Sequence, residues 1–119
     1  MKKILLVEDE KLIREMYIFK LENEGFEIFE AINIKEAERV LNKKKIDLMI
    51  LDILLSKENG LDYLERLQKG KREVPTVIVM SNLEGHEYRE RAKELNAKDY
   101  FLKTSYVPSE IVGLVKKYL

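Results

Sequence analysis

Cysteine is absent from the 119-residue sequence, which excludes disulfide bonds, zinc–thiolate sites and a thiol nucleophile. An excess of charge is absent as well, because 22 lysine and arginine residues balance 22 aspartate and glutamate residues. Proteins that bind nucleic acid usually have a basic excess, so we expect no direct contact with nucleic acid.

Long apolar runs are also missing, since no stretch approaches the roughly 20 residues needed to span a bilayer. The first run extends only from Ile4 to Val7 before acidic residues follow, which is too short for a signal peptide. These absences predict a cytoplasmic protein with no membrane partner. A content of 45% hydrophobic and 37% charged residues fits a soluble globular domain.

Short apolar runs are present instead, and they alternate with stretches of helical spacing. The runs are at residues 4–7, 28–29, 48–51, 76–80 and 100–102. Unbroken runs of this length are typical of strands that are buried on both faces of a parallel sheet. Glu27 and Glu30 flank the run at 28–29, so we expect that strand at an edge of the sheet.

The intervening stretches each place apolar residues on one face of a helix. The residues that share a face are Ile13, Met16, Tyr17 and Leu21; Ile34, Ala37, Val40 and Leu41; Leu61, Leu64 and Leu67; Tyr88, Ala92 and Leu95; and Ile111, Leu114, Val115 and Tyr118. Gly25 and Asn96 follow the first and fourth stretches, where a left-handed residue is favoured, and Pro108 suits the first turn of the fifth helix.

This alternation predicts an α/β fold of the (βα)5 type, with a doubly wound parallel five-stranded sheet and helices on both faces. No linker or repeat divides the chain, so we expect one domain over residues 1–119. The last predicted helix ends the sequence, and we therefore expect a single-domain protein without an output domain.

Polar side chains follow four of the five predicted strands. In chain order they are Glu8, Asp9, Asp52, Ser81, Asn82, Lys103 and Thr104. Because ligands bind at the carboxyl ends of the strands in an open α/β sheet, we expect these side chains to meet at one edge. Neighbouring carboxylates repel one another unless a cation intervenes, and ligand sets made only of oxygen suit Mg²⁺. A carboxylate can also attack phosphorus, while a metal, an ammonium and a hydroxyl hold the phosphoryl oxygens.

On these residues the sequence resembles the receiver domains of two-component response regulators, over nearly the whole chain. The matching features are an acidic pair after the first strand, an aspartate that ends the third, a glycine eight residues later, a hydroxyl that ends the fourth, and an aromatic residue three before a lysine. Here these residues are Glu8 and Asp9, Asp52, Gly60, Ser81, Tyr100 and Lys103.

The resemblance implies a flavodoxin-like fold with strand order 2-1-3-4-5 and a phosphorelay function similar to that of single-domain chemotaxis regulators. Asp52 would accept a phosphoryl group from a sensor histidine kinase or a phosphotransfer protein. The resemblance implies a Mg²⁺ ion bound by Glu8, Asp9, Asp52 and the backbone carbonyl of Leu54.

The resemblance also implies that Lys103 and Ser81 contact the phosphoryl oxygens and that Ser81 and Tyr100 form the switch. Tyr100 would change rotamer and alter the face made by the fourth helix, the fifth strand and the fifth helix, for a downstream protein target. The protein would be a signalling switch that catalyses only its own phosphoryl transfer and dephosphorylation. We expect a monomer or a weak phosphorylation-dependent homodimer.

Three residues depart from the family pattern. Ser56 and Thr104 replace prolines, and Asn82 replaces an alanine beside Ser81. We expect a looser loop at 56–59, and narrower access to the site beside Asn82. Since a cis bond without proline costs about 2.5–4 kcal/mol, we predict a trans Lys103–Thr104 bond and an altered path for the loop that follows.

These departures favour an alternative function, that of a phosphorylation-independent pseudo-receiver that acts as a protein-interaction module. A flavin or nucleotide binder is a further alternative for an α/β fold. However, no glycine-rich loop follows the first predicted strand, and Glu8, Asp9 and Glu10 would repel a phosphate there.

Overall fold

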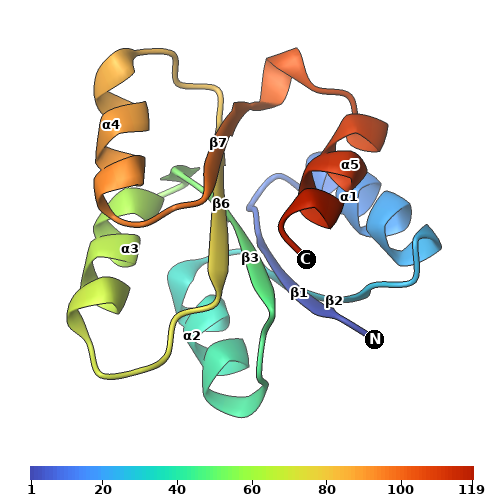
Figure 1. Cartoon of the computed structure of the whole chain (residues 1–119), viewed down its shortest axis with the longest axis horizontal. Coiled ribbons are helices and arrows are strands. Elements are labelled where there is room, and N and C mark those ends of the chain that lie inside the picture. The colour runs from blue at the N-terminus through green and yellow to red at the C-terminus, as the bar shows by residue number, and fades with distance from the viewer.

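A parallel sheet of five strands forms the centre of the computed structural model, which describes all 119 residues. The strands are β1 (Lys3–Val7), β2 (Glu27–Ala31), β3 (Leu48–Asp52), β6 (Thr76–Ser81) and β7 (Asp99–Leu102). Their order across the sheet is β2-β1-β3-β6-β7 (Figure 1). Because β4 and β5 lie outside this sheet, the order corresponds to 2-1-3-4-5 and the predicted fold is confirmed. The edge position predicted for the run at 28–29 is also confirmed, since β2 is an outer strand.

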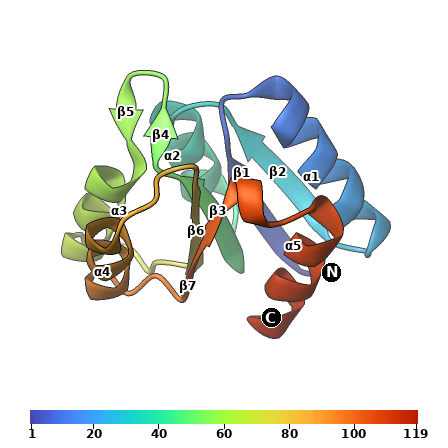
Figure 2. The ribbon, with the colours of Figure 1, turned by 90° about the horizontal axis from the view of Figure 1, so that it is seen from above.

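Helices cover both faces of the sheet. They are α1 (Lys11–Asn23), α2 (Ile34–Lys43), α3 (Gly60–Lys69), α4 (His86–Glu94) and α5 (Pro108–Lys117). Figure 2 shows α1 and α5 on one side of the sheet and α2, α3 and α4 on the other. None of these helices combines the length and the apolar composition that crossing a bilayer requires.

Side chains of the strands alternate between two core layers, as the pleat of a strand requires. Leu5 and Val77 are buried in the layer beneath α2, α3 and α4, whereas Ile4 and Ile78 are buried in the layer beneath α1 and α5. The apolar runs are therefore unbroken because both faces of each central strand are covered.

Three of the predicted helix boundaries have the expected geometry. Gly25 and Asn96 have φ angles of 90° and 65°, which is the left-handed region expected after a helix. Pro108 is the first residue of α5, where its missing N–H costs no hydrogen bond.

The predicted inner face of α1 is wrong at one position. Tyr17 and Leu21 are buried, but Met16 is 49% exposed. Residues four apart lie on the same helical stripe, so Met16 shares its stripe with Leu12, which is also exposed. The sequence pattern was ambiguous here because α1 has apolar residues on two adjacent stripes.

The segment after β3 is a small hairpin and not the looser loop expected from Ser56. Strands β4 (Leu54–Leu55) and β5 (Glu58–Asn59) pair in antiparallel fashion. The Asn59 side chain accepts hydrogen bonds from the amides of Leu61 and Asp62 and so caps α3. Strand pairing and the cap together order this segment without the proline.

Gly60 connects the hairpin to α3 directly beside the carboxyl end of β3. A β-carbon at this position would lie 2.1 Å from the backbone oxygen of Asp52. Only glycine fits this close approach, and the Gly60 amide donates a hydrogen bond to the Ile53 carbonyl at 2.7 Å. The glycine therefore lets α3 start beside the end of β3.

Candidate functional site

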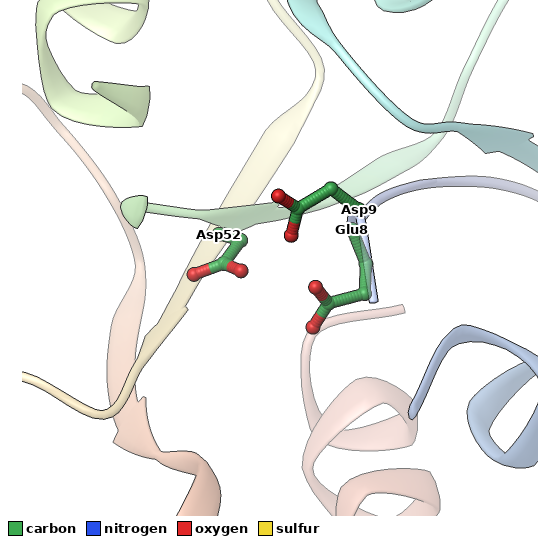
Figure 3. Close-up of side chains that lie close together, drawn as sticks. All are labelled: Glu8, Asp9 and Asp52. Atoms are coloured by element: carbon green, nitrogen blue, oxygen red, sulfur yellow. The ribbon is translucent and has the colours of Figure 1, made fainter. Parts of the chain in front are cut away.

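Three carboxylates meet at the carboxyl edge of the sheet. Glu8 and Asp9 follow β1, and Asp52 is the last residue of the neighbouring strand β3. Each carboxylate offers an oxygen atom within 4.8 Å of the others, and Figure 3 shows the three side chains gathered at one point. Glu8 is fully buried and Asp52 is only 2% exposed, while Asp9 is half-buried at the opening of the cluster.

Lys103, directly after β7, supplies one positive charge to this cluster. Its Nζ atom lies 2.7 Å from Asp52 Oδ2 and 2.6 Å from Glu8 Oε1. A single buried ammonium thus lies between two buried carboxylates. The predicted trans bond between Lys103 and Thr104 is confirmed, since the chain has no cis peptide bond. A short 3-10 helix, Lys103–Ser105, begins at the lysine.

Burial dominates the ionisation of this cluster. It raises the pKa of Asp52 to about 7, and the adjacent Glu8 carboxylate acts in the same direction against the opposing effect of Lys103. Burial alone would lower the pKa of Lys103, but its hydrogen bond to Asp52 and the charges of both carboxylates raise it overall. The site therefore has one cation for three carboxylates and favours binding of a second cation.

The donor atoms fit a hard divalent cation such as Mg²⁺. Glu8 Oε1 is buried, and its one charged neighbour is the Lys103 ammonium at 2.6 Å, which it shares with Asp52. All the candidate side-chain ligands are oxygens, which suits Mg²⁺. The Leu54 amide donates to Asp52 Oδ1 at 3.2 Å, so the Leu54 peptide lies beside the cluster. Its carbonyl as a ligand stays a prediction.

Arg14, which the sequence analysis missed, contacts the acidic loop, which is the segment Glu8–Glu10 between β1 and α1. Arg14 Nη1 donates to the backbone carbonyls of Glu8 and Asp9, at 3.1 and 3.3 Å, and Arg14 Nε pairs with Glu30 at 3.2 Å. The only signal in the sequence is a basic residue one turn into the helix that follows the acidic pair. Periodicity alone would place that residue on a solvated surface.

Comparison with known protein families identifies the domain that carries this site. The family model of the response regulator receiver domain matches residues 4–116. This chain belongs to the response regulator receiver domain family. The receiver domain is therefore a part of a two-component system and serves phosphorelay signal transduction. Receiver domains are signalling switches.

Known relatives agree with this assignment. The receiver domain is 36% identical to the phosphate regulon transcriptional regulatory protein PhoB of Pseudomonas aeruginosa, in a match that covers 99% of this chain and 52% of PhoB. It is 38% identical to the sensory transduction protein LytT of Bacillus subtilis, over 99% of this chain and 48% of LytT. The chain thus spans about half the length of these relatives, and its action as a single-domain regulator stays a prediction.

A solved structure agrees as well. The receiver domain protein (CheY-like) of Methanospirillum hungatei superimposes with a TM-score of 0.88 at 25% identity, covering 98% of this chain and 92% of that chain. A response regulator from Thermotoga maritima gives a TM-score of 0.86 at 24% identity, over 99% of this chain and 97% of that chain, and supports the fold alone.

The predicted switch residues of the receiver domain lie on the other side of Asp52. Ser81 is buried at the end of β6, and its Oγ accepts a hydrogen bond from the Leu83 amide at 2.9 Å. Tyr100 is only 7% exposed, and its hydroxyl donates to the Leu83 carbonyl at 2.7 Å. Both side chains therefore contact the same residue of the segment that leads into α4, whereas Asn82 is exposed.

Arg89 of α4 is a second residue that the sequence analysis missed. Its guanidinium lies 4.8 Å from the centre of the Tyr100 ring and donates to the Tyr100 carbonyl at 3.1 Å. This contact covers the ring from the α4 side. A lone arginine on a polar helix gives no sequence signal for such a contact.

Proposed function

We propose that this receiver domain accepts a phosphoryl group on Asp52 in a Mg²⁺-dependent reaction. The donor would be a sensor histidine kinase or a phosphotransfer protein. The supporting observation is the cluster of Glu8, Asp9 and Asp52, in which one ammonium, that of Lys103, pairs with the two buried carboxylates of Glu8 and Asp52. A buried excess of negative charge is costly to the fold, so a role in binding a cation gives a reason to keep it.

Glu8, Asp9, Asp52 and the Leu54 carbonyl would hold the ion. Bound there, Mg²⁺ supplies the second positive charge, which keeps Asp52 ionised and offsets the charge of the phosphoryl oxygens. One Asp52 oxygen attacks phosphorus, the bond from phosphorus to the donor nitrogen breaks, and its electron pair stays on that nitrogen. The Lys103 ammonium moves from the carboxylate to a phosphoryl oxygen, so the charge that held Asp52 then holds its product.

Transmission would begin at Ser81. A phosphoryl group adds a charge of about −1.5 to −2 beside this hydroxyl, which then donates to a phosphoryl oxygen. Rotation of the Ser81 side chain toward the phosphoryl group weakens its contact with the Leu83 amide. The carbonyl of Leu83 also accepts the hydrogen bond from Tyr100. The face made by α4, β7 and α5 would respond through a shift of populations and present itself to a downstream protein. A cytoplasmic location and weak homodimerisation through this face stay predictions.

Intact mass spectrometry tests the proposal directly. Wild-type protein incubated with Mg²⁺ and a small phosphodonor should gain one phosphoryl group, and this adduct should disappear in EDTA. Asp52→Asn should gain none, whereas Asp62→Asn, which removes an exposed carboxylate outside the site, should react as wild type does. An unmodified wild type, or an adduct that persists in Asp52→Asn, would contradict the proposal.

The pseudo-receiver is the second candidate, favoured by Ser56, Asn82 and Thr104 in place of the usual family residues. It predicts that the cluster binds no Mg²⁺ and that partner binding ignores a phosphodonor. The short distances from Lys103 to Glu8 and Asp52 argue against it, because Thr104 leaves the reach of the lysine intact. Calorimetric titration with MgCl₂ separates the two candidates.

A further inference from the structure

Arg14 is held at three points beside the acidic loop. The loop between the end of β1 at Val7 and the start of α1 at Lys11 has only three residues, two of which are Glu8 and Asp9. Arg14 Nη1 donates to the carbonyls of both acidic residues, while Nε pairs with Glu30, which lies on β2. The Arg14 side chain is only 12% exposed, so its bonds to the two carbonyls are partly shielded from water, whereas the Glu30 side chain is 56% exposed.

We infer that Arg14 is a positioning residue for the cation site, and this inference rests on the proposed function. The guanidinium holds the two backbone carbonyls on the α1 side of the loop, while the carboxylates of Glu8 and Asp9 gather with Asp52 on the inner side (Figure 3). Fixing both peptide groups fixes the directions in which the two carboxylates leave the backbone. Glu30 anchors the guanidinium to β2, so the loop is tied to the sheet.

The other hydrogen bonds of the loop do not hold the carbonyls of Glu8 and Asp9. The Glu8 amide donates to the Ala31 carbonyl, and the Glu10 amide donates to Glu8 Oε2. These bonds engage donors of the loop backbone, whereas the carbonyls of Glu8 and Asp9 receive their side-chain hydrogen bonds from Arg14 alone. Without the guanidinium, the peptide between Asp9 and Glu10 would keep only the bond from its amide to Glu8 Oε2, so the half-buried Asp9 carboxylate would be held less firmly.

Charge and geometry make opposite predictions for this residue. Arg14 is a cation next to a site that binds a cation, so its charge alone opposes Mg²⁺ binding and its removal should strengthen binding. Loss of positioning should weaken binding, by roughly tenfold if Arg14 acts as other groups that orient metal ligands do. The sign of the change in affinity therefore separates a positioning role from a simple effect of charge.

The test is a calorimetric titration of the full chain with MgCl₂ in the absence of a phosphodonor. Arg14→Gln removes both the charge and the hydrogen bonds, while Arg14→Lys keeps the charge but loses the fork that reaches two carbonyls and Glu30. We expect both variants to bind Mg²⁺ about tenfold more weakly than wild type. Lys11→Gln, which removes an exposed charge from the same helix, should bind as well as wild type or more tightly.

Thermal melting in EDTA, run on each variant, identifies a merely structural role. A lower melting temperature with an unchanged Mg²⁺ affinity would assign Arg14 to stability and overturn the inference, as would tighter binding in Arg14→Gln. Should Arg14→Gln fail to fold, Arg14→Lys decides by the same criteria. Wild type that binds no Mg²⁺ would overturn the proposed function together with the inference. Equal Mg²⁺ affinities of wild type and both variants would overturn the inference alone.

Discussion

The two sides of Asp52 are held in different ways. On the metal side, which is the loop of Glu8 and Asp9 together with Arg14, a buried ion pair joins Glu8 to Lys103, and Arg14 connects the loop to Glu30 of β2. On the reading side, which is Ser81, Tyr100 and α4, the helix has one buried residue, Ala92. The neighbouring helix α3 has five buried residues.

The start of α4 adds to this difference. Gly85 precedes it with a φ of 133° and offers no side chain to cap the helix. A rigid metal side keeps the reacting groups in place, whereas a weakly packed helix can move at low cost when the charge at Asp52 changes. Three substitutions and one exchange measurement test this difference, in order of decreasing effect.

Gly60→Ala should have the largest effect, because the added β-carbon would displace the backbone at Asp52. Its β-carbon would meet the Asp52 carbonyl oxygen, which is backbone and cannot move aside cheaply. We expect a loss of about 3–5 kcal/mol in the free energy of unfolding, measured by urea denaturation. The matched control is Gly113→Ala in α5, where no atom lies near the added carbon and stability should rise by about 0.5–1 kcal/mol. Equal effects of the two substitutions would contradict the close approach at Gly60.

Asp52→Asn should stabilise the metal-free protein by roughly 1–3 kcal/mol at pH 8. Burial raises the pKa of Asp52 from 3.8 to about 7, so in the folded state this group resists ionisation. Below pH 4 Asp52 is protonated in both states and does not lower the free energy of unfolding. As the pH rises through 7 the buried carboxyl must ionise, and the free energy of unfolding falls. The gain from Asp52→Asn should therefore grow between pH 4 and pH 7, as measured by urea denaturation in EDTA.

Mg²⁺ should reverse the order of the two proteins, because an ion that binds only the folded wild type stabilises it by mass action. Asp62→Asn serves as the control, since it removes an exposed carboxylate outside the cluster. If the gain in the free energy of unfolding from Asp52→Asn stays constant from pH 4 to pH 8, burial of the ionised carboxylate does not destabilise the folded protein.

Native-state hydrogen exchange compares the two sides directly. The amides of α4 should exchange about tenfold faster than those of the central turns of α1, because Tyr17 and Leu21 anchor α1 in the core. Deuterium uptake followed by NMR at single residues gives this ratio. Equal protection of the two helices would remove the basis for assigning movement to α4.

The metal side was also more predictable from the sequence than the reading side. Glu8, Asp9 and Asp52 follow apolar runs, and a parallel sheet brings the ends of its strands together, so their meeting could be foreseen. The strand order came from the family resemblance. Arg14 could not be predicted, because a side chain that binds backbone carbonyls leaves no periodic signal in the sequence.

The reading side and the hairpin depend on contacts that residue types alone do not encode. The ring contact of Arg89 with Tyr100 depends on how α4 packs beside β7, and any residue of a polar helix could have occupied that place. The hairpin after β3 was expected as a looser loop, because the rule about proline took no account of the pairing of β4 with β5 or of the Asn59 cap. Met16 was misplaced because two adjacent apolar stripes fit the helical period equally well.

Tyr100→Phe should have the smallest effect on stability and should separate the two sides functionally. It removes the hydroxyl that donates to the Leu83 carbonyl, which should cost about 1 kcal/mol in the free energy of unfolding. The rate of Asp52 phosphorylation by a small phosphodonor should stay unchanged, because Lys103 and the carboxylates are untouched. The change in α4 amide exchange on phosphorylation should become smaller, since the hydroxyl that links β7 to the α4 segment is gone.

Tyr118→Phe is the matched control for this substitution, because it removes a similar hydrogen bond, to Asp99 Oδ2 at 2.8 Å, away from α4. It should leave both the phosphorylation rate and the response of α4 as they are in wild type. A slower reaction of Asp52 in Tyr100→Phe would mean that the reading side takes part in the chemistry. An undiminished response of α4 would mean that the signal leaves Ser81 without Tyr100, so that the Leu83 backbone alone connects the phosphorylation site to the helix.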